Sequence, residues 1–241
     1  MKIQAFPKTI EDALRSHESP PRVFEGFFSA NEISWLLEQE QLCEKVEKAG
    51  GVINYKYAKG GAVEKFIEEK VSPYFGKLVR HGGSFVKTPV AFHAHTDTGK
   101  ADEMKGKLFP YKNILIPLQS STPAQPLYTV FFRQRNFGEA SHFWNAKEFE
   151  TRVPFYNHKV TDYSGLAYRL ESSFNPEDHE KHLSHLPIES LNGLSISETI
   201  HWKLGDLVAF DCSTLHASNN FEKFGAVKHG LSYFGSKEIA L

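Results

Sequence analysis

Residues 205–216 have the sequence Gly205-Asp206-Leu207-Val208-Ala209-Phe210-Asp211-Cys212-Ser213-Thr214-Leu215-His216, and this stretch decides the fold. A glycine–aspartate turn leads into an apolar strand, and after a short bend the run ends in a histidine. Far upstream, the extended run 85–92 leads into His93-Ala94-His95-Thr96-Asp97. Side chains two residues apart on a strand project to the same face, so His95 and Asp97 can offer an imidazole and a carboxylate to one ion. His216 would complete the set from a distant strand.

Two histidines and one carboxylate are typical of a mononuclear ferrous site, because they leave open positions for a co-substrate and oxygen. The chain has 12 histidines in 241 residues, so a chance H-x-D is not rare and the context has to carry the interpretation. Residues 112–118 and 127–132 predict two further strands, and residues 228–234 predict a closing strand that begins with a basic residue.

This order of features resembles the 2-oxoglutarate- and Fe(II)-dependent oxygenases over residues 85–236. The resemblance implies a mainly β fold with flanking α, a double-stranded β-helix (a jelly-roll, cupin-like barrel) whose mouth holds iron. It implies His95, Asp97 and His216 as metal ligands and catalytic residues, Fe(II) and 2-oxoglutarate as cofactors, and molecular oxygen as a partner. The implied reaction is hydroxylation of a small-molecule or peptidyl substrate, with release of succinate and CO2.

Lys228 lies 12 residues beyond His216 (228 − 216), where the family has an arginine or lysine that pairs with the distal carboxylate of 2-oxoglutarate. A lysine there is most like the prolyl-hydroxylase branch. Lysine acts as a compact charge, whereas arginine grips a carboxylate through two parallel hydrogen bonds. We therefore expect a neighbouring hydroxyl to assist Lys228, and the candidates are Tyr111, Ser232 and Tyr128. The alternative cations are Lys223 and Arg169.

A different class of function stays open, a cupin-like metal-binding module or a non-catalytic ligand-binding barrel. His93 shares a strand face with His95, and cupins use H-x-H followed shortly by glutamate. Here Thr98, Gly99 and Lys100 follow instead, so we expect His93 to be a pocket residue. The complete H-x-D…H set together with Lys228 favours the enzyme.

The pattern predicts one domain over residues 1–241, with an α-rich N-terminal support (1–84) and a barrel core (85–236). Asp97 and His216 are 119 residues apart (216 − 97), which predicts an insertion near 133–200, either a lid beside the mouth or a surface decoration. In the support, Ser29 and Glu32 have capping-box spacing and predict a helix through about Lys48. A second helix is predicted from Ala62 to the interruption at Pro73.

Polar residues of the insertion suggest two further interpretations. His179, His182 and His185 have three-residue spacing, but their charged neighbours favour a solvated helix over a metal site. Four arginines could recognise an acidic substrate or form ion pairs: Arg133, Arg135, Arg152 and Arg169.

Composition limits the remaining possibilities. The formal net charge is −1 and the pI is about 6.9, which provides no basic field for nucleic acid. Cys43 and Cys212 are the only cysteines, and they suggest no disulfide framework or zinc site; Cys212 is expected to be a buried free thiol. No signal-peptide pattern or membrane-spanning run is present, so we expect a soluble, cytoplasmic protein with no membrane partner.

Overall fold

A computed structural model describes residues 7–99, 104, 107–119, 126–138, 160–161 and 172–239. The helices are α1 (Lys8–Ser16), α2 (Ala30–Gln41), α3 (Ala62–Phe75) and α6 (Pro176–Asp178), with short helical turns at Ala49–Gly51, His179–Leu183, Ile188–Leu191 and Glu222–Phe224. The strands are β1 (Arg22–Phe24), β2 (Glu44–Glu47), β3 (Ile53–Lys56), β4 (Val79–Gly82), β5 (Phe85–Thr88), β6 (Leu108–Pro117), β7 (Tyr128–Asn136), β8 (Val160–Thr161), β9 (Ile196–His201), β10 (Leu207–Asp211), β11 (Thr214–Ser218) and β12 (Lys228–Glu238).

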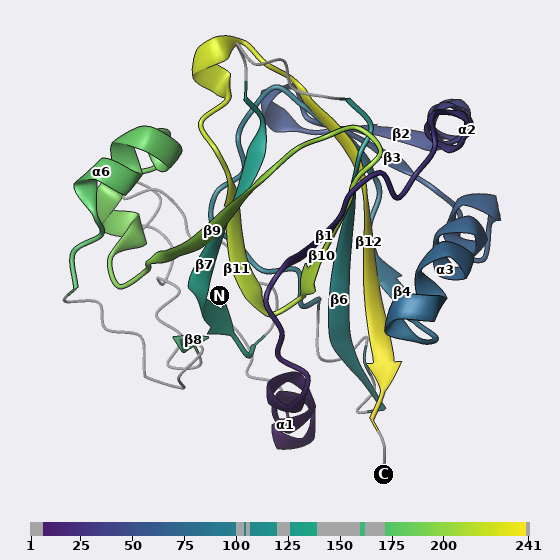
Figure 1. Cartoon of the computed structure of the whole chain (residues 1–241), viewed down its shortest axis with the longest axis horizontal. Coiled ribbons are helices and arrows are strands. Elements are labelled where there is room, and N and C mark those ends of the chain that lie inside the picture. Colours follow the sequence, from purple (N-terminus) through teal and green to yellow (C-terminus); the bar gives the residue numbers. More distant parts are fainter. Residues whose placement is uncertain are drawn as a thin grey trace.

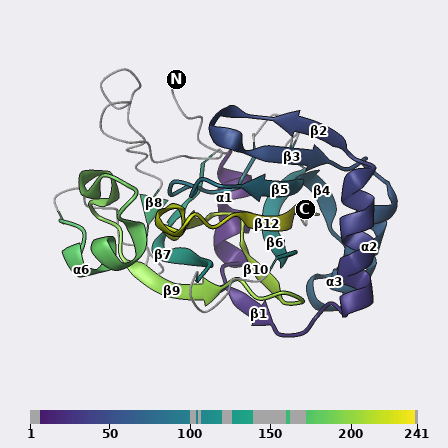
Figure 2. The same ribbon diagram turned by 90° about the horizontal axis from the view of Figure 1, so that it is seen from above.

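Two antiparallel sheets face each other across the middle of the molecule (Figures 1 and 2). The major sheet has the order β1-β10-β6-β12-β5-β3-β2, with β4 paired to β12. In the minor sheet β11 and β9 flank β7, and His95 forms an isolated bridge with His216 of β11. The chain therefore crosses repeatedly between the sheets. It passes from β5 to the His95 bridge, back to β6, on to β7 and β9 of the minor sheet, and then through β10, β11 and β12 in alternation. This order is that of a jelly roll, and it confirms the predicted double-stranded β-helix.

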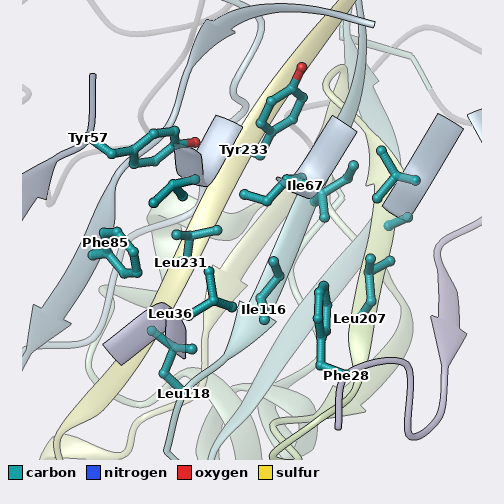
Figure 3. Close-up of a cluster of buried hydrophobic side chains, with 14 of the residues drawn as sticks. Phe28, Leu36, Tyr57, Ile67, Phe85, Ile116, Leu118, Leu207, Leu231 and Tyr233 are labelled. Atoms are coloured by element: carbon teal, nitrogen blue, oxygen red, sulfur yellow. The ribbon is translucent and has the colours of Figure 1, made fainter. Parts of the chain in front are cut away.

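Helices α2 and α3 cover the outer face of the major sheet (Figure 2). Their apolar faces pack on alternate residues of the strands, and Figure 3 shows Leu36 and Ile67 of the helices beside Ile116 and Leu231 of β6 and β12. All four side chains are fully or almost fully buried. Because strand residues alternate in direction, the neighbours of these core residues face the space between the sheets.

The support region contains fewer helical residues than its pattern predicts. The Ser29 capping box is present, but α2 ends at Gln41 rather than near Lys48. Residues 44–47 instead pair with β3, because strand pairing outweighs a weak helical stripe. Helix α3 begins at Ala62 as predicted and continues through Pro73 to Phe75. Pro73 has no N–H for the Glu69 carbonyl, and the Ser72 hydroxyl donates to that carbonyl instead, at 3.2 Å.

Much of the predicted insertion lies outside the described residues, including Arg152 and Arg169. Its described residues include 133–138 at the end of β7 and 160–161 of β8, while the segment from 172 onward contains α6 and β9 and packs on the outer face of the minor sheet through residues such as Phe174, Leu183 and Leu191. The prediction of a solvated helix is wrong for His182, which is buried and accepts or donates a hydrogen bond with the Tyr128 hydroxyl at 2.9 Å. No helix in the described ranges combines the length and apolar character that crossing a bilayer requires.

Candidate metal centre and its cavity

The two sequence-distant histidines meet through backbone pairing. The His95 N–H donates to the His216 carbonyl at 2.9 Å, and the His216 N–H donates to the His95 carbonyl at 3.0 Å. Two residues further on, the Asp97 N–H donates to the carbonyl of Cys212 at 3.2 Å. Cys212 is a fully buried free thiol, as predicted. These bonds fix the H-x-D segment against the turn between β10 and β11.

His95, Asp97 and His216 place their ligand atoms within 4.8 Å of one another. The Nε2 atom of His216 lies 3.3 Å from Oδ2 of Asp97, and the Nε2 atom of His95 lies 3.8 Å from Oδ1 of the same carboxylate. The three residues are therefore brought together with both imidazoles directed at one carboxylate. They are the one such cluster of His, Cys, Asp and Glu found in the described ranges.

Both imidazoles are oriented by backbone carbonyls. Nδ1 of His95 lies 2.7 Å from the His93 carbonyl, and Nδ1 of His216 lies 3.1 Å from the Thr214 carbonyl. A carbonyl only accepts, so each Nδ1 carries a proton, and in the neutral ring each Nε2 then presents a lone pair. This tautomer is the one that a metal-ligating histidine needs.

Two side chains that the sequence did not single out hold Asp97 in place. Asn113 is fully buried on β6, and its Nδ2 donates to Oδ2 of Asp97. His81 on β4 lies with Nε2 at 3.3 Å from the Asp97 carbonyl, while its Nδ1 contacts the Ser236 hydroxyl at 2.7 Å. Desolvation by burial lowers the pKa of His81, which favours a neutral ring. The sequence offered one signal for Asn113, a polar side chain directly before the apolar residues 114–118 of a predicted strand.

The cluster opens into a cavity of about 660 Å³ between the two sheets. Leu115, Thr129, Trp202 and Lys228 line it together with the three candidate ligands, and Phe92 and Phe234 add aromatic surface. A Cβ atom on Gly230 would come within 2.3 Å of the Trp202 ring, so only glycine lets this indole pack flat against β12. The Trp202 indole N–H donates to the His229 carbonyl at 3.2 Å.

Lys228 places its ammonium inside this cavity. Its Nζ donates to the Thr129 hydroxyl at 3.3 Å and lies 4.2 Å from the centroid of the Trp202 ring. The residue is 8% exposed, and no carboxylate within the described ranges pairs with it. Burial lowers the pKa of Lys228 to about 7, because desolvation penalises the charged form. The cavity thus contains a buried cation that no carboxylate of the described residues neutralises.

The structure separates the three hydroxyls that were expected to assist Lys228. Ser232 lines the cavity, but its hydroxyl exchanges hydrogen bonds with the backbone of Ser84, both at 3.1 Å. Tyr111 is not a lining residue and packs against His17 and Phe109.

Tyr128 faces the outer side of the minor sheet, where it contacts His182, and it does not line the cavity. The hydroxyl that contacts Lys228 belongs to Thr129, the next residue along β7, which points to the opposite face. Neighbouring residues of a strand point to opposite faces, so one of Tyr128 and Thr129 has to face the cavity. The sequence of this largely apolar strand does not indicate which of the two does.

The other sequence candidates lie at different places. His93 lines the cavity, as expected of a pocket residue, and is not part of the three-residue cluster. Lys223 is exposed and does not line the cavity, and Arg169 lies outside the described residues. Arg135 is fully buried in an ion pair with Asp211, so it serves the structure and not a substrate.

No family model and no curated protein matches the chain. The epimerase SnoN, solved with Fe3+, alpha ketoglutarate and nogalamycin RO, is 11% identical over 95% of this chain and 84% of its own, with a TM-score of 0.48. HygX from Streptomyces hygroscopicus, with nickel, 2-oxoglutarate and hygromycin B, is 10% identical over 94% and 85%, with a TM-score of 0.48. A Pseudomonas putida prolyl-4-hydroxylase is 10% identical over 94% and 96%, with a TM-score of 0.46. At such low identities and TM-scores, these likenesses carry no argument about the activity of this chain.

Proposed function

We propose that the chain is an Fe(II)- and 2-oxoglutarate-dependent oxygenase that hydroxylates a C–H bond of a substrate bound in the cavity. The observation that carries the proposal is the combination of two features in one cavity. A cluster of two histidines and one carboxylate lies at its wall, and the buried cation Lys228, which pairs with no carboxylate in the part of the chain that the structure describes, lies in the same space.

The donor set fits ferrous iron. Two Nε2 lone pairs and a carboxylate form a 2-His-1-carboxylate set, which leaves open positions toward the cavity. The carbonyls bonded to each Nδ1 and the Asn113 amide bonded to Asp97 supply the outer contacts that such ligands usually have. A zinc site of structural type would instead be closed by a fourth protein ligand.

The surroundings of Lys228 fit the distal carboxylate of 2-oxoglutarate. His216 pairs with Phe131 across the minor sheet, and Thr129, which contacts Lys228, is two residues further along β7. Two residues of strand correspond to about 7 Å, a separation that a short dicarboxylate can bridge between the cluster and the ammonium. A carboxylate there would restore the charge state that burial disfavours.

Bound iron would use molecular oxygen as the oxidant: one oxygen atom would enter succinate as 2-oxoglutarate loses CO2, and the other would enter the C–H bond of the substrate. The residues of the chain bind and orient. Lys228 and Thr129 hold the far carboxylate and thereby set the direction of the co-substrate, while Trp202 and Leu115 exclude water from its apolar middle. His95, Asp97 and His216 fix where the reaction takes place, and the open remainder of the cavity receives the substrate.

The test is an anaerobic titration of the Fe(II)-loaded protein with 2-oxoglutarate, followed by visible absorption. Chelation of ferrous iron by a keto acid produces a weak charge-transfer band, so we expect a saturable band in the wild type and none in His216→Ala. Lys228→Met should need tenfold or more 2-oxoglutarate, because a hydrogen bond to a charged group contributes about 1.5–3 kcal/mol. The matched control is Lys223→Met, an exposed lysine outside the cavity that should behave as wild type.

A protein that binds iron but develops no band would support the alternative, a cupin-like or non-catalytic barrel. If Lys228→Met binds 2-oxoglutarate with the same affinity as the wild type, the proposed iron site stands, but Lys228 does not bind the co-substrate. Mass-spectrometric detection of succinate, with a trapped oxidised product, then tests turnover.

A further inference from the structure

The wall of the cavity formed by β3 contains a buried amide whose N–H group has no acceptor among the described residues. Asn54 is 8% exposed and lines the cavity, and it pairs with Val86 of β5 in the sheet. Its Oδ1 accepts from the Ser84 hydroxyl at 3.3 Å, whereas its Nδ2 has no hydrogen-bond partner among the described residues. A buried donor without an acceptor is unfavourable, so this amide is well placed to meet an acceptor on a ligand.

The same side of the cavity carries uncompensated positive charge. The lining includes Lys48, Lys56 and Lys59, here called the lysine rim, which follow β2, end β3 and occupy the next turn. Asp97 is the one carboxylate in the described lining, and it belongs to the metal cluster. The chain as a whole has 28 basic and 29 acidic residues, so this local excess does not reflect overall composition.

A structural role accounts for Arg80 of the cavity lining, and Lys228 is assigned to the co-substrate, but neither explanation covers the lysine rim. Arg80 pairs with Glu64 at 3.2 Å and donates to the carbonyls of Gly82 and Gly83. Lysines on an edge strand discourage strand addition, yet Lys56 lies on β3, which is internal to the sheet. Glu44 lies opposite Lys56 in the β2–β3 ladder, but it does not line the cavity and no ion pair joins the two.

We propose that the substrate carries an oxyanion, a carboxylate or a phosphate, which accepts a hydrogen bond from Nδ2 of Asn54 and is attracted by the lysine rim. The proposal rests on the proposed function, since it assigns Lys228 to the co-substrate and the β3 wall to the substrate. Phe92 and Phe234 give the same cavity an aromatic lining, and the Phe92 ring lies beside that of His95. The substrate is therefore an acid with an apolar body, and its oxidised carbon lies away from the acidic group.

The experiment measures binding by equilibrium dialysis of three probes with similar frames, 3-phenylpropionate, 3-phenylpropanamide and 2-phenylethyl phosphate. It uses the full-length Lys228→Met protein without added metal, so neither the co-substrate lysine nor catalysis contributes. At least one anionic probe should bind about tenfold tighter than the amide, and its affinity should fall as salt is raised. The tighter of the two anions identifies the oxyanion.

Substitutions then locate the site. Asn54→Asp keeps the shape and the acceptor for Ser84 but replaces the donor by a charge, so it should weaken anion binding tenfold or more. Lys48, Lys56 and Lys59 changed together to glutamine should also remove most of the salt dependence. The control changes Lys8, Lys77 and Lys223 to glutamine, which alters the net charge equally at exposed positions outside the cavity, and it should have no effect.

Equal binding of the anions and the amide, including no binding of any probe, would overturn the proposal. Anion binding unaffected by Asn54→Asp in a protein with an unchanged melting temperature would also overturn it. Neither result bears on the iron titration, and a failed titration would leave the dialysis result standing as evidence for an anion site. The two proposals therefore fail separately.

Discussion

Both histidines of the candidate metal site are oriented by the same kind of local hydrogen bond. In each, Nδ1 contacts the carbonyl two residues earlier in the chain, that of His93 for His95 and that of Thr214 for His216. The backbone of the ligand's own segment therefore sets the tautomer. The Asp97 carboxylate is held from another strand, because it accepts from the Asn113 amide at a sequence separation of 16 residues. Asn113 is thus the residue whose loss should harm the cluster most without removing a ligand.

Asn113→Ala should weaken Fe(II) binding about 10- to 100-fold, because contacts that orient metal ligands commonly contribute that much. Anaerobic calorimetric titration with Fe(II) measures the affinity. Asn31→Ala, at an exposed position of α2, is the matched control and should bind iron as the wild type does. Unchanged affinity in Asn113→Ala would show that Asp97 needs no support from β6.

Lys228 predicts a pH dependence whose sign follows from its lowered pKa. The pKa is about 7 in the free protein, so the ammonium is present below pH 7 and is lost as the pH rises. A bound carboxylate favours the charged form, so binding of 2-oxoglutarate above pH 7 takes up a proton and weakens by up to tenfold per pH unit. Calorimetry at pH 8 in two buffers of different ionisation enthalpy should detect uptake of nearly one proton. Lys228→Met should show none.

The same pKa also affects folding. In the unfolded chain Lys228 has its ordinary pKa near 10.5, so between pH 7 and 10.5 the unfolded state binds a proton that the folded state lacks. The contribution of Lys228 to the free energy of unfolding therefore rises with pH across this window. Denaturant unfolding of the wild type and of Lys228→Met at pH 7 and pH 9 measures this contribution. The free energy of unfolding of the wild type should rise relative to that of the variant between the two pH values.

At the scale of elements, strand alternation explains what the sequence could and could not predict. On β12 the residues Lys228, Gly230, Ser232 and Phe234 line the cavity, while Tyr233 packs toward the helices. This strand and its basic residue were predicted from sequence. The predicted run 85–92 is shorter in the structure, because Pro89 cannot donate to the ladder and β5 ends at Thr88. Strands β2 and β9 were missed, since pairing with distant partners decides them.

Gly230→Ala tests the close approach between β12 and Trp202. The added Cβ would lie 2.3 Å from the indole, so we expect a loss of about 1–3 kcal/mol in the free energy of unfolding from overpacking. The double variant Gly230→Ala with Trp202→Leu removes the obstructing ring. A double-mutant cycle from denaturant unfolding should then show a favourable coupling of at least 0.5 kcal/mol. Simple additivity would mean that the two residues do not meet.

At the scale of the whole molecule, one buried ionic network joins both sheets to the N-terminal segment. Asp211 of β10 pairs with Lys112 of β6 and Arg135 of β7, and it accepts from the Ser19 N–H at 2.7 Å. Arg135 also donates to the Ser19 carbonyl at 2.6 Å. The sequence separations of these contacts run from 76 to 192 residues, so no local pattern could predict them. By contrast, short sequence motifs predicted the three candidate metal ligands, the H-x-D of residues 95–97 and the histidine that ends the stretch 205–216.

Asp211→Asn should therefore destabilise the protein far more than an ordinary carboxylate substitution. Removing the charge leaves Lys112 buried without its anion and leaves Arg135 with the Glu18 carboxylate at 4.0 Å, and breaking a buried pair costs about 3–5 kcal/mol. Asp206→Asn is the matched control, because Asp206 is also buried but accepts from the Gly26 N–H, a neutral donor that an amide oxygen can still satisfy. Its cost should be about 1 kcal/mol. Denaturant unfolding of both variants measures the difference, and equal costs would mean that the network does not hold the two sheets and the N-terminal segment together.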